Sequence, residues 1–289
     1  MGSAELAIAK EKLPDLLDPS QQERLVDQYF AKTKTDMAKW LDRSLASETE
    51  LWLKVILFLK LILLDNPYKC NDGDEPNADD RGYLCTDLPI VLYKMCVEVL
   101  KVAAGISAEL KNRVYDVVVD EMATFAESFT TAMGEYKTKH LADRGSNVVK
   151  IKYYHQYMVA SINNCRQISD NFAKIQTELE IESEAADVNP FGQSPMDESR
   201  IAQIMGDIAN AGCKMFCEEV LIDLKPWFDK LLTKDDWLDN MSGGPCQTIC
   251  VTVEDYSQDF SALQPDYLFY LLVELERLVA IEYIKVLII

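Results

Sequence analysis

Two pairs of cysteines have a spacing that could support metal chemistry. Cys213 and Cys217 lie four residues apart, as do Cys246 and Cys250, so each pair would place both thiols on one face of a helix. Four thiolates form a zinc-binding set, but zinc-binding cysteines usually occupy tight turns. The neighbouring side chains, Phe216 among them, are typical of a core. The sequence therefore favours buried free thiols over a zinc site.

The sequence contains two histidines, His140 and His155. Neither belongs to an HExxH motif or a comparable metal-ligand spacing, and neither forms a recognisable grouping with a serine or cysteine nucleophile. The phosphate-binding patterns GxxxxGK[ST] and GxGxxG do not occur in the sequence either. No catalytic, cofactor-binding or metal-ligating residues are therefore predicted, and both histidines are interpreted as ordinary packed or surface side chains.

An acidic motif provides the sharpest enzyme hypothesis. Asp235, Asp236 and Asp239 match the DDxxD pattern with which all-α prenyl-diphosphate enzymes hold magnesium. Such a site also needs a second acidic motif and several basic side chains facing the anionic diphosphate. Between Asp235 and Glu276 there are nine acidic residues and no Lys or Arg, so the charge pattern disfavours this enzyme. The chain is predicted not to be an enzyme.

The overall charge excludes one class of partner. The chain of 289 residues carries 29 Lys and Arg against 48 Asp and Glu, a formal net charge of −19. Because phosphate backbones are held mainly by Lys and Arg, nucleic acid is not expected as a partner. The acidic stretch Asp235–Glu276 leaves two interpretations open: a surface for a basic protein partner, or a plain solvated face.

A polar segment separates the first predicted helix from the second. Asn71–Gly82 combines Gly, Pro and like charges, which disfavour regular structure, so a solvated loop is predicted there. Within it, Asn71–Asp80 loosely matches a calcium loop. It lacks the glycine at the sixth position and the closing Glu of an EF-hand, so calcium binding is not predicted.

Helical periodicity dominates the rest of the sequence. Apolar residues recur at three- and four-residue steps and nowhere alternate strictly over a long stretch, which predicts an all-α fold of elongated antiparallel helical bundles. Asp18 and Ser107 are suited to cap helices, and Pro226 is expected to bend or split the helix that contains it. The expected helices cover about 18–47, 87–106, 107–141, 150–181, 198–232, 246–260 and 265–289.

The ends of the predicted helical set raise two specific expectations. The first helix is expected to end near Ser47, with a buried stripe of Leu25, Tyr29, Trp40, Leu41 and Leu45. The last helix has an apolar face at Val286, Leu287, Ile288 and Ile289 that nothing else in the sequence covers.

The predicted domain organisation follows the chain. Residues 1–182 are expected to form a first helical bundle with an irregular or inserted stretch at 54–82, residues 183–197 a linker, and residues 198–289 the start of a second bundle, truncated at its C-terminus. The apolar run Leu51–Leu64 is 14 residues long and contains two lysines, which is short of the ~20 residues needed to cross a bilayer. The N-terminus lacks the pattern of a signal peptide, so a cytoplasmic location with reduced cysteines is expected.

Several longer motifs point to one family. Thr248–Phe260 (TICVTVEDYSQDF), followed by Glu282–Ile284, resembles the core of the exocyst complex component 3 family, subunits of the vesicle-tethering exocyst. Further matches occur in the expected order over about four-fifths of the chain: Leu45–Trp52, Asp87–Met95, Lys101–Lys111, Tyr157–Ile168 and Cys217–Leu238. The resemblance lapses in the apolar run Val55–Leu64, where a shorter polar connector would be expected.

The resemblance implies a fold and a role. Helical-bundle rods of the multisubunit-tethering-complex type would link secretory vesicles to the plasma membrane in exocytosis. The implied partners are other exocyst subunits, SNARE proteins and their regulators, with recruitment from the cytoplasm to sites of exocytosis. Little direct membrane binding is expected at this net charge. The alternative is an exocyst-like interaction protein that acts outside the complex in membrane protrusion.

Overall fold

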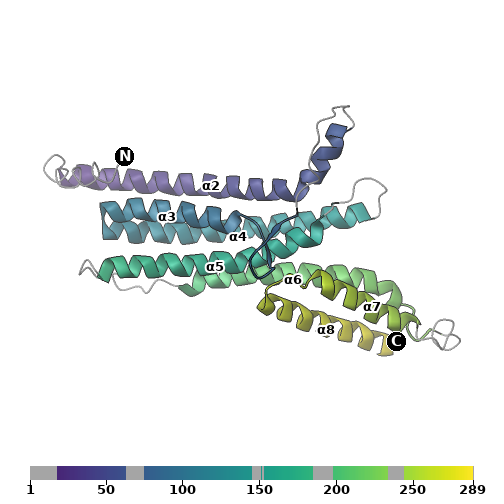
Figure 1. The fold of residues 1–289 in the computed structure, drawn as a ribbon. Coiled ribbons are helices and arrows are strands. Elements are labelled where there is room, and N and C mark those ends of the chain that lie inside the picture. The colour runs from purple at the N-terminus through teal and green to yellow at the C-terminus, as the bar shows by residue number, and fades with distance from the viewer. Residues whose placement is uncertain are drawn as a thin grey trace. The chain divides into compact units, whose positions relative to one another are not determined.

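A computed structural model describes residues 18–62, 75–144, 151, 153–184, 198–233 and 244–288 (Figure 1). The acidic motif Asp235–Asp239 and most of the predicted linker 183–197 lie outside these residues. The elements in chain order are α2 (Pro19–Ile62), β1 (Asn77–Ala78), β2 (Leu84–Cys85), α3 (Leu88–Ile106), α4 (Ala108–Arg144), α5 (Tyr154–Glu184), α6 (Glu198–Phe228), α7 (Gly244–Asp259) and α8 (Pro265–Ile288).

The all-α prediction is confirmed, and local capping chemistry explains where two helices begin. The Asp18 carboxylate accepts the backbone N–H of Gln21 at 3.0 Å at the start of α2. The Ser107 hydroxyl accepts the N–H of Leu110 at 3.0 Å at the start of α4. Each bond satisfies a donor that has no partner inside its helix. Pro226 does not split α6. It lies in the last turn of the helix, which ends two residues later at Phe228.

The prediction that the first helix ends near Ser47 is wrong, because α2 continues to Ile62. The backbone of 54–62, expected to be irregular, is therefore helical. No glycine or proline interrupts the segment. Trp52 is buried at 3% exposure, with its ring centroid 5.2 Å from that of Tyr136 in α4, so tertiary packing supports the continued helix. No helix in the described part of the chain is both long and apolar enough to span a membrane.

The chain divides into two compact units that are not consecutive in sequence. Unit 1 comprises residues 1–48, 87–129 and 167–205, and unit 2 comprises residues 49–86, 130–166 and 206–289. The predicted division at 183–197 followed the order of the chain instead. Four of the helices, α2, α4, α5 and α6, each contribute residues to both units, which a search for loops and linkers does not reveal.

In unit 1, α2 packs through a narrow stripe. Thr33, Met37 and Leu41 are buried four residues apart, whereas Leu25 and Trp40 are 49% and 39% exposed. The prediction that Leu25 and Trp40 belong to the buried stripe is therefore wrong, because both lie beside the narrow packing face. Apolar residues of α4 and α5 at helical spacing form the rest of the core in this unit, and they include Leu110, Val114, Val117, Phe125, Phe129, Ile168, Phe172 and Ile175.

In unit 2, the segment predicted as a solvated loop contains ordered structure. Strands β1 and β2 pair antiparallel, with Asn77 opposite Cys85 and Ala78 opposite Leu84. The Asp79 carboxylate accepts the backbone N–H groups of Arg81 and Tyr83, each at 2.9 Å, which stabilises the turn between the strands. Gly82 has φ +87°, a conformation that glycine adopts without strain. The prediction of a solvated loop is thus wrong for β1, whereas residues 80–82 form an exposed turn and residues 71–74 lie outside the described residues.

Buried asparagines of α5 attach other parts of unit 2 to that helix. Asn163 donates to the carbonyl oxygens of Leu84 and Ala262, each at 2.9 Å, and accepts the N–H of Gln264 at 2.9 Å. It thereby connects β2 and the α7–α8 turn to α5. The side-chain oxygen of Asn164 accepts the backbone N–H of Thr86 at 3.1 Å, and its amide donates to the Thr86 hydroxyl oxygen at 2.8 Å.

Candidate functional site

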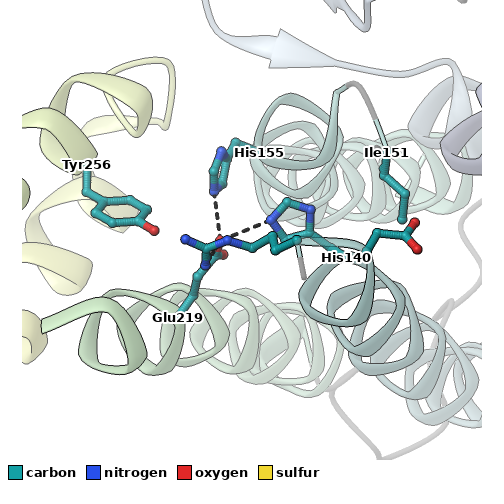
Figure 2. A pocket seen from close by; sticks show the side chains of 7 residues that line it. His140, Ile151, His155, Glu219 and Tyr256 are labelled. Carbon is teal, nitrogen blue, oxygen red and sulfur yellow. Dashed lines mark hydrogen bonds and ion pairs between the residues drawn. The ribbon is translucent and has the colours of Figure 1, made fainter. Parts of the chain in front are cut away.

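Three helices of unit 2 bring together the two histidines and one buried glutamate. His140 comes from α4, His155 from the first turn of α5 and Glu219 from the middle of α6. The Nε2 atoms of His140 and His155 lie 3.1 Å and 3.2 Å from the same carboxylate oxygen, Oε1 of Glu219 (Figure 2). We call His140, His155 and Glu219 the His–Glu cluster. The interpretation of both histidines as ordinary packed or surface side chains did not include this arrangement.

Close packing of the helices positions the cluster. Gly212 of α6 faces α5, where an added Cβ atom would lie 2.7 Å from Cγ1 of Ile162, so the two helices approach closely at this point. The ring of His140 stacks on Tyr154, with centroids 3.9 Å apart and an interplanar angle of 5°. The orientation of this imidazole is therefore set by contacts on both its edge and its face.

Glu219 is charged although its side chain is only 1% exposed. Burial raises the pKa of its carboxyl, but the hydrogen bonds and electrostatic interactions with His140 and His155 lower the pKa more, to about 2. Nη1 of Arg144 lies 3.4 Å from the same oxygen, Oε1. The second oxygen, Oε2, is buried and has no hydrogen-bond partner within the described ranges.

A second carboxylate extends the network away from Glu219. Nη2 of Arg144 pairs with Asp223, and the hydroxyl of Tyr256 in α7 donates to the same Asp223 oxygen at 2.6 Å. Burial and this contact with a carboxylate raise the pKa of the Tyr256 hydroxyl. Figure 1 shows α7 and α8 beside the C-terminal part of α6, and the Tyr256 bond is one of the links that hold α7 there.

A cavity of about 260 Å³ adjoins the His–Glu cluster. Asp143, Arg144, Ile151 and Tyr256 complete its lining, and Figure 2 shows the labelled side chains of Ile151 and Tyr256 on opposite sides of the two imidazoles. Within the described ranges, His140, His155 and Glu219 form the one group of three or more potential metal ligands whose atoms lie close together, all within 4.8 Å.

The cysteine pairs lie apart from this cluster. Cys213 and Cys217 are buried in α6, with their sulfur atoms 3.8 Å from the carbonyl oxygens of Tyr267 and Leu271 in α8. Burial raises the pKa of both thiols to about 12. Cys250 on α7 is exposed, so the four thiols do not form one zinc-binding set among the described residues.

Sequence reasoning missed the His–Glu cluster because its members share no local motif. Glu219 lies 79 residues from His140 and 64 residues from His155. One signal was present: Glu219 occupies the apolar register of α6, three residues after the fully buried Phe216 and five before the fully buried Leu224. An acidic residue at a core position requires a partner, which the sequence alone did not identify.

The fold and its buried polar network define an all-helical bundle protein, and solved structures share this fold. The crystal structure of the C-terminal domain of the exocyst subunit Sec6p has a TM-score of 0.70 at 15% identity, covering 94% of this chain and 65% of that one. The crystal structure of M-Sec has a TM-score of 0.62 at 19% identity, covering 93% of this chain and 39% of that one.

Sequence comparisons identify the family. The family model described as "Exocyst complex component Sec6" matches residues 1–288, so the chain belongs to that family, which confirms the resemblance. Exocyst complex component 3 of Caenorhabditis elegans is 24% identical over 93% of this chain and 33% of its own length. The exocyst complex component 3-like protein of Bos taurus is 26% identical over 99% of this chain and 34% of its length. The chain thus spans about a third of these relatives.

Proposed function

We propose that this chain is a non-enzymatic helical segment of a vesicle-tethering exocyst subunit, and that it acts by binding other exocyst subunits. The family match over residues 1–288 carries the proposal. The cavity beside the His–Glu cluster, at about 260 Å³, is itself smaller than the ~300–1,000 Å³ typical of small-molecule sites. The buried cores of both units also fit a protein whose helices present surfaces to other proteins.

The finer function is part of the same proposal. The chain would help to tether secretory vesicles to the plasma membrane during exocytosis, from a cytoplasmic location, with contacts to SNARE proteins and their regulators. The names of the relatives as exocyst components support the assignment to the complex. The net charge of −19 supports protein partners over anionic membrane surfaces.

The surface of α8 offers apolar side chains for protein contacts. Phe269, Ile284 and Ile288 are 71%, 52% and 79% exposed. Near each end of the helix, further exposed apolar residues follow three or four positions after Phe269 and Ile284. Leu287, on the face that the sequence left uncovered, is also exposed. Exposed apolar area of this kind is typical of surfaces that bind other proteins.

Co-purification with individual exocyst subunits tests the proposal. The tagged chain is expected to retain at least one of them, and retention that falls with added salt would indicate a basic partner on the acidic stretch Asp235–Glu276. Phe269→Glu combined with Ile284→Glu tests whether α8 contributes, with Lys285→Gln on the same helix, outside the acidic stretch, as the control. Failure of the folded chain to bind any subunit would contradict the proposal.

The enzyme alternative has its own assay. The Asp235→Ala variant and the unchanged chain are expected to behave alike in a magnesium-dependent diphosphate-release assay, with no release by either. Release that depends on Asp235 would contradict the non-enzymatic assignment.

A second candidate is an exocyst-like protein that acts outside the complex in membrane protrusion. The similarity to exocyst complex component 3-like proteins, at 26% identity for the Bos taurus protein, supports this second candidate function. Sedimentation with anionic vesicles separates the two candidates. Strong vesicle binding without retention of any exocyst subunit would favour the second.

A further inference from the structure

We propose that the His–Glu cluster is a binding site for a divalent transition-metal ion of the zinc class, held by Nε2 of His140, Nε2 of His155 and the carboxylate of Glu219. The site joins α4, α5 and α6 of unit 2. It lies apart from the thiols to which the cysteine spacing first pointed.

The distances already resemble those of a metal centre. Ligand atoms about 2.1 Å from one tetrahedral zinc ion lie about 3.4 Å from each other. The two imidazole nitrogens lie 3.1 Å and 3.2 Å from Glu219 Oε1, and the three ligand atoms all lie within 4.8 Å of one another, so movement of the side chains alone would bring them around one ion. Figure 2 shows both rings directing the same edge toward the carboxylate.

Glu219 itself supplies a second and independent observation. Its side chain is 1% exposed, and Oε2 is buried without a hydrogen-bond partner in the part of the chain that the structure describes. An unsatisfied buried carboxylate oxygen is costly. A bound cation would be an electrostatic partner for both oxygens, and would replace the two imidazole N–H bonds that now converge on Oε1.

The surrounding charges also fit a dication. Besides Glu219, the charged groups around the site among the described residues are the carboxylates of Asp143, Asp223 and Asp259 and the guanidinium of Arg144. Arg144 is shared with Asp223, so its charge does not belong to Glu219 alone. Oδ2 of Asp259 lies 4.0 Å from Nδ1 of His155, beyond hydrogen-bond distance but on the side of the ring where a carboxylate would orient a metal-bound imidazole.

The donor set determines the class of ion. Two imidazole nitrogens and one carboxylate suit zinc, cobalt or nickel, whereas magnesium and calcium take oxygen ligands. The adjoining cavity of about 260 Å³ leaves room for water as a fourth ligand. Because the three protein ligands come from three helices, binding is expected to stabilise unit 2.

Cobalt titration of the chelator-treated, tag-free chain tests the site. Removal of any polyhistidine tag is essential, since the natural sequence has only two histidines. Visible absorption bands of coordinated Co²⁺ are expected to appear at one equivalent, to disappear when Zn²⁺ is added, and to be unaffected by Mg²⁺. The thermal midpoint is expected to rise with Zn²⁺. His155→Gln and His140→Gln are each expected to weaken binding at least about 100-fold.

Two controls keep the result decisive. Cys246→Ser combined with Cys250→Ser removes the more accessible thiol pair and is expected to leave binding unchanged. If a histidine variant does not fold, the imidazole NMR signals of the unchanged chain provide the readout, because both histidines should shift together on addition of Zn²⁺. Absence of binding at millimolar Zn²⁺, binding lost only in the cysteine variant, or histidine signals that do not move would overturn the proposal.

Discussion

Replacement of Asn163 by alanine should destabilise unit 2 strongly, because this side chain makes three hydrogen bonds to backbone groups. Its amide donates to Leu84 and Ala262, and its oxygen accepts from Gln264. A typical hydrogen bond contributes ~1 kcal/mol net, and a buried partner left unsatisfied costs ~1–3 kcal/mol. We expect Asn163→Ala to lower the free energy of unfolding by about 3–5 kcal/mol.

Two further asparagine variants separate the causes. Asn171→Ala removes one bond, to the carbonyl oxygen of Pro89 at 3.3 Å, and is expected to cost about 1 kcal/mol. Asn163→Asp keeps the acceptor for Gln264 but turns a carboxylate toward two carbonyl oxygens. Because the folded state then disfavours the ionised carboxyl, its pKa is raised there, and the loss of stability should be larger at pH 7 than at pH 4.

Two measurements suffice for this series. Chemical denaturation followed by circular dichroism reports the free energies, and hydrogen exchange reports the Gln264 amide directly. Exchange at Gln264 should accelerate in Asn163→Ala and change less in Asn163→Asp, which retains its acceptor. A loss below ~1 kcal/mol for Asn163→Ala, with Gln264 as protected as before, would refute this account of how the α7–α8 turn is attached to α5.

Other predictions concern packing and thiol access. Gly212→Ala should destabilise the fold by about 1–3 kcal/mol, because its Cβ atom would lie 2.7 Å from Cγ1 of Ile162. Gly206→Ala on the same helix, where nothing lies within 4 Å of an added Cβ atom, should stabilise the fold by up to ~1 kcal/mol. Shifts of the thermal midpoint in the same direction for both variants would contradict this prediction. Alkylation at pH 8 should label the exposed Cys250 quickly and Cys213 only on unfolding, as mass spectrometry would show. Tyr256→Ala should cost about 3 kcal/mol in urea unfolding, and no change would place the ring outside the core.

The elements that local periodicity controls could be predicted from the sequence. The helical spacing of apolar residues places Met158, Ile162 and Cys165 of α5 on a buried face, and the cap predicted at Ser107 is present. Both features depend on residues within a few turns of each other. The end of α2 could not be predicted in this way, because packing of Trp52 on Tyr136 of another helix supports its continuation past Ser47.

The buried polar groups required information that one sequence does not contain. Asn163 belongs to a motif, Tyr157–Ile168, that the sequence analysis used only to recognise the family. Its bonded partners lie 79 to 101 residues away. The same holds for Glu219, whose partners come from two other helices. Periodicity shows that a helix has a buried face but not which distant polar group meets it there.

These polar groups also address a problem that apolar stripes leave unsolved. A stripe repeated every three or four residues over many turns can be shifted by one turn against its neighbour with little change in buried apolar area. The hydrogen bonds of Asn163, and those of Glu219 with His140 and His155, can form in only one alignment of the helices along their axes. Each of these side chains has partners at fixed positions on other segments. Buried polar groups set helix register in other bundles in the same way. We therefore expect Asn163 and Glu219 to act on the alignment of the helices in unit 2 as well as on its stability.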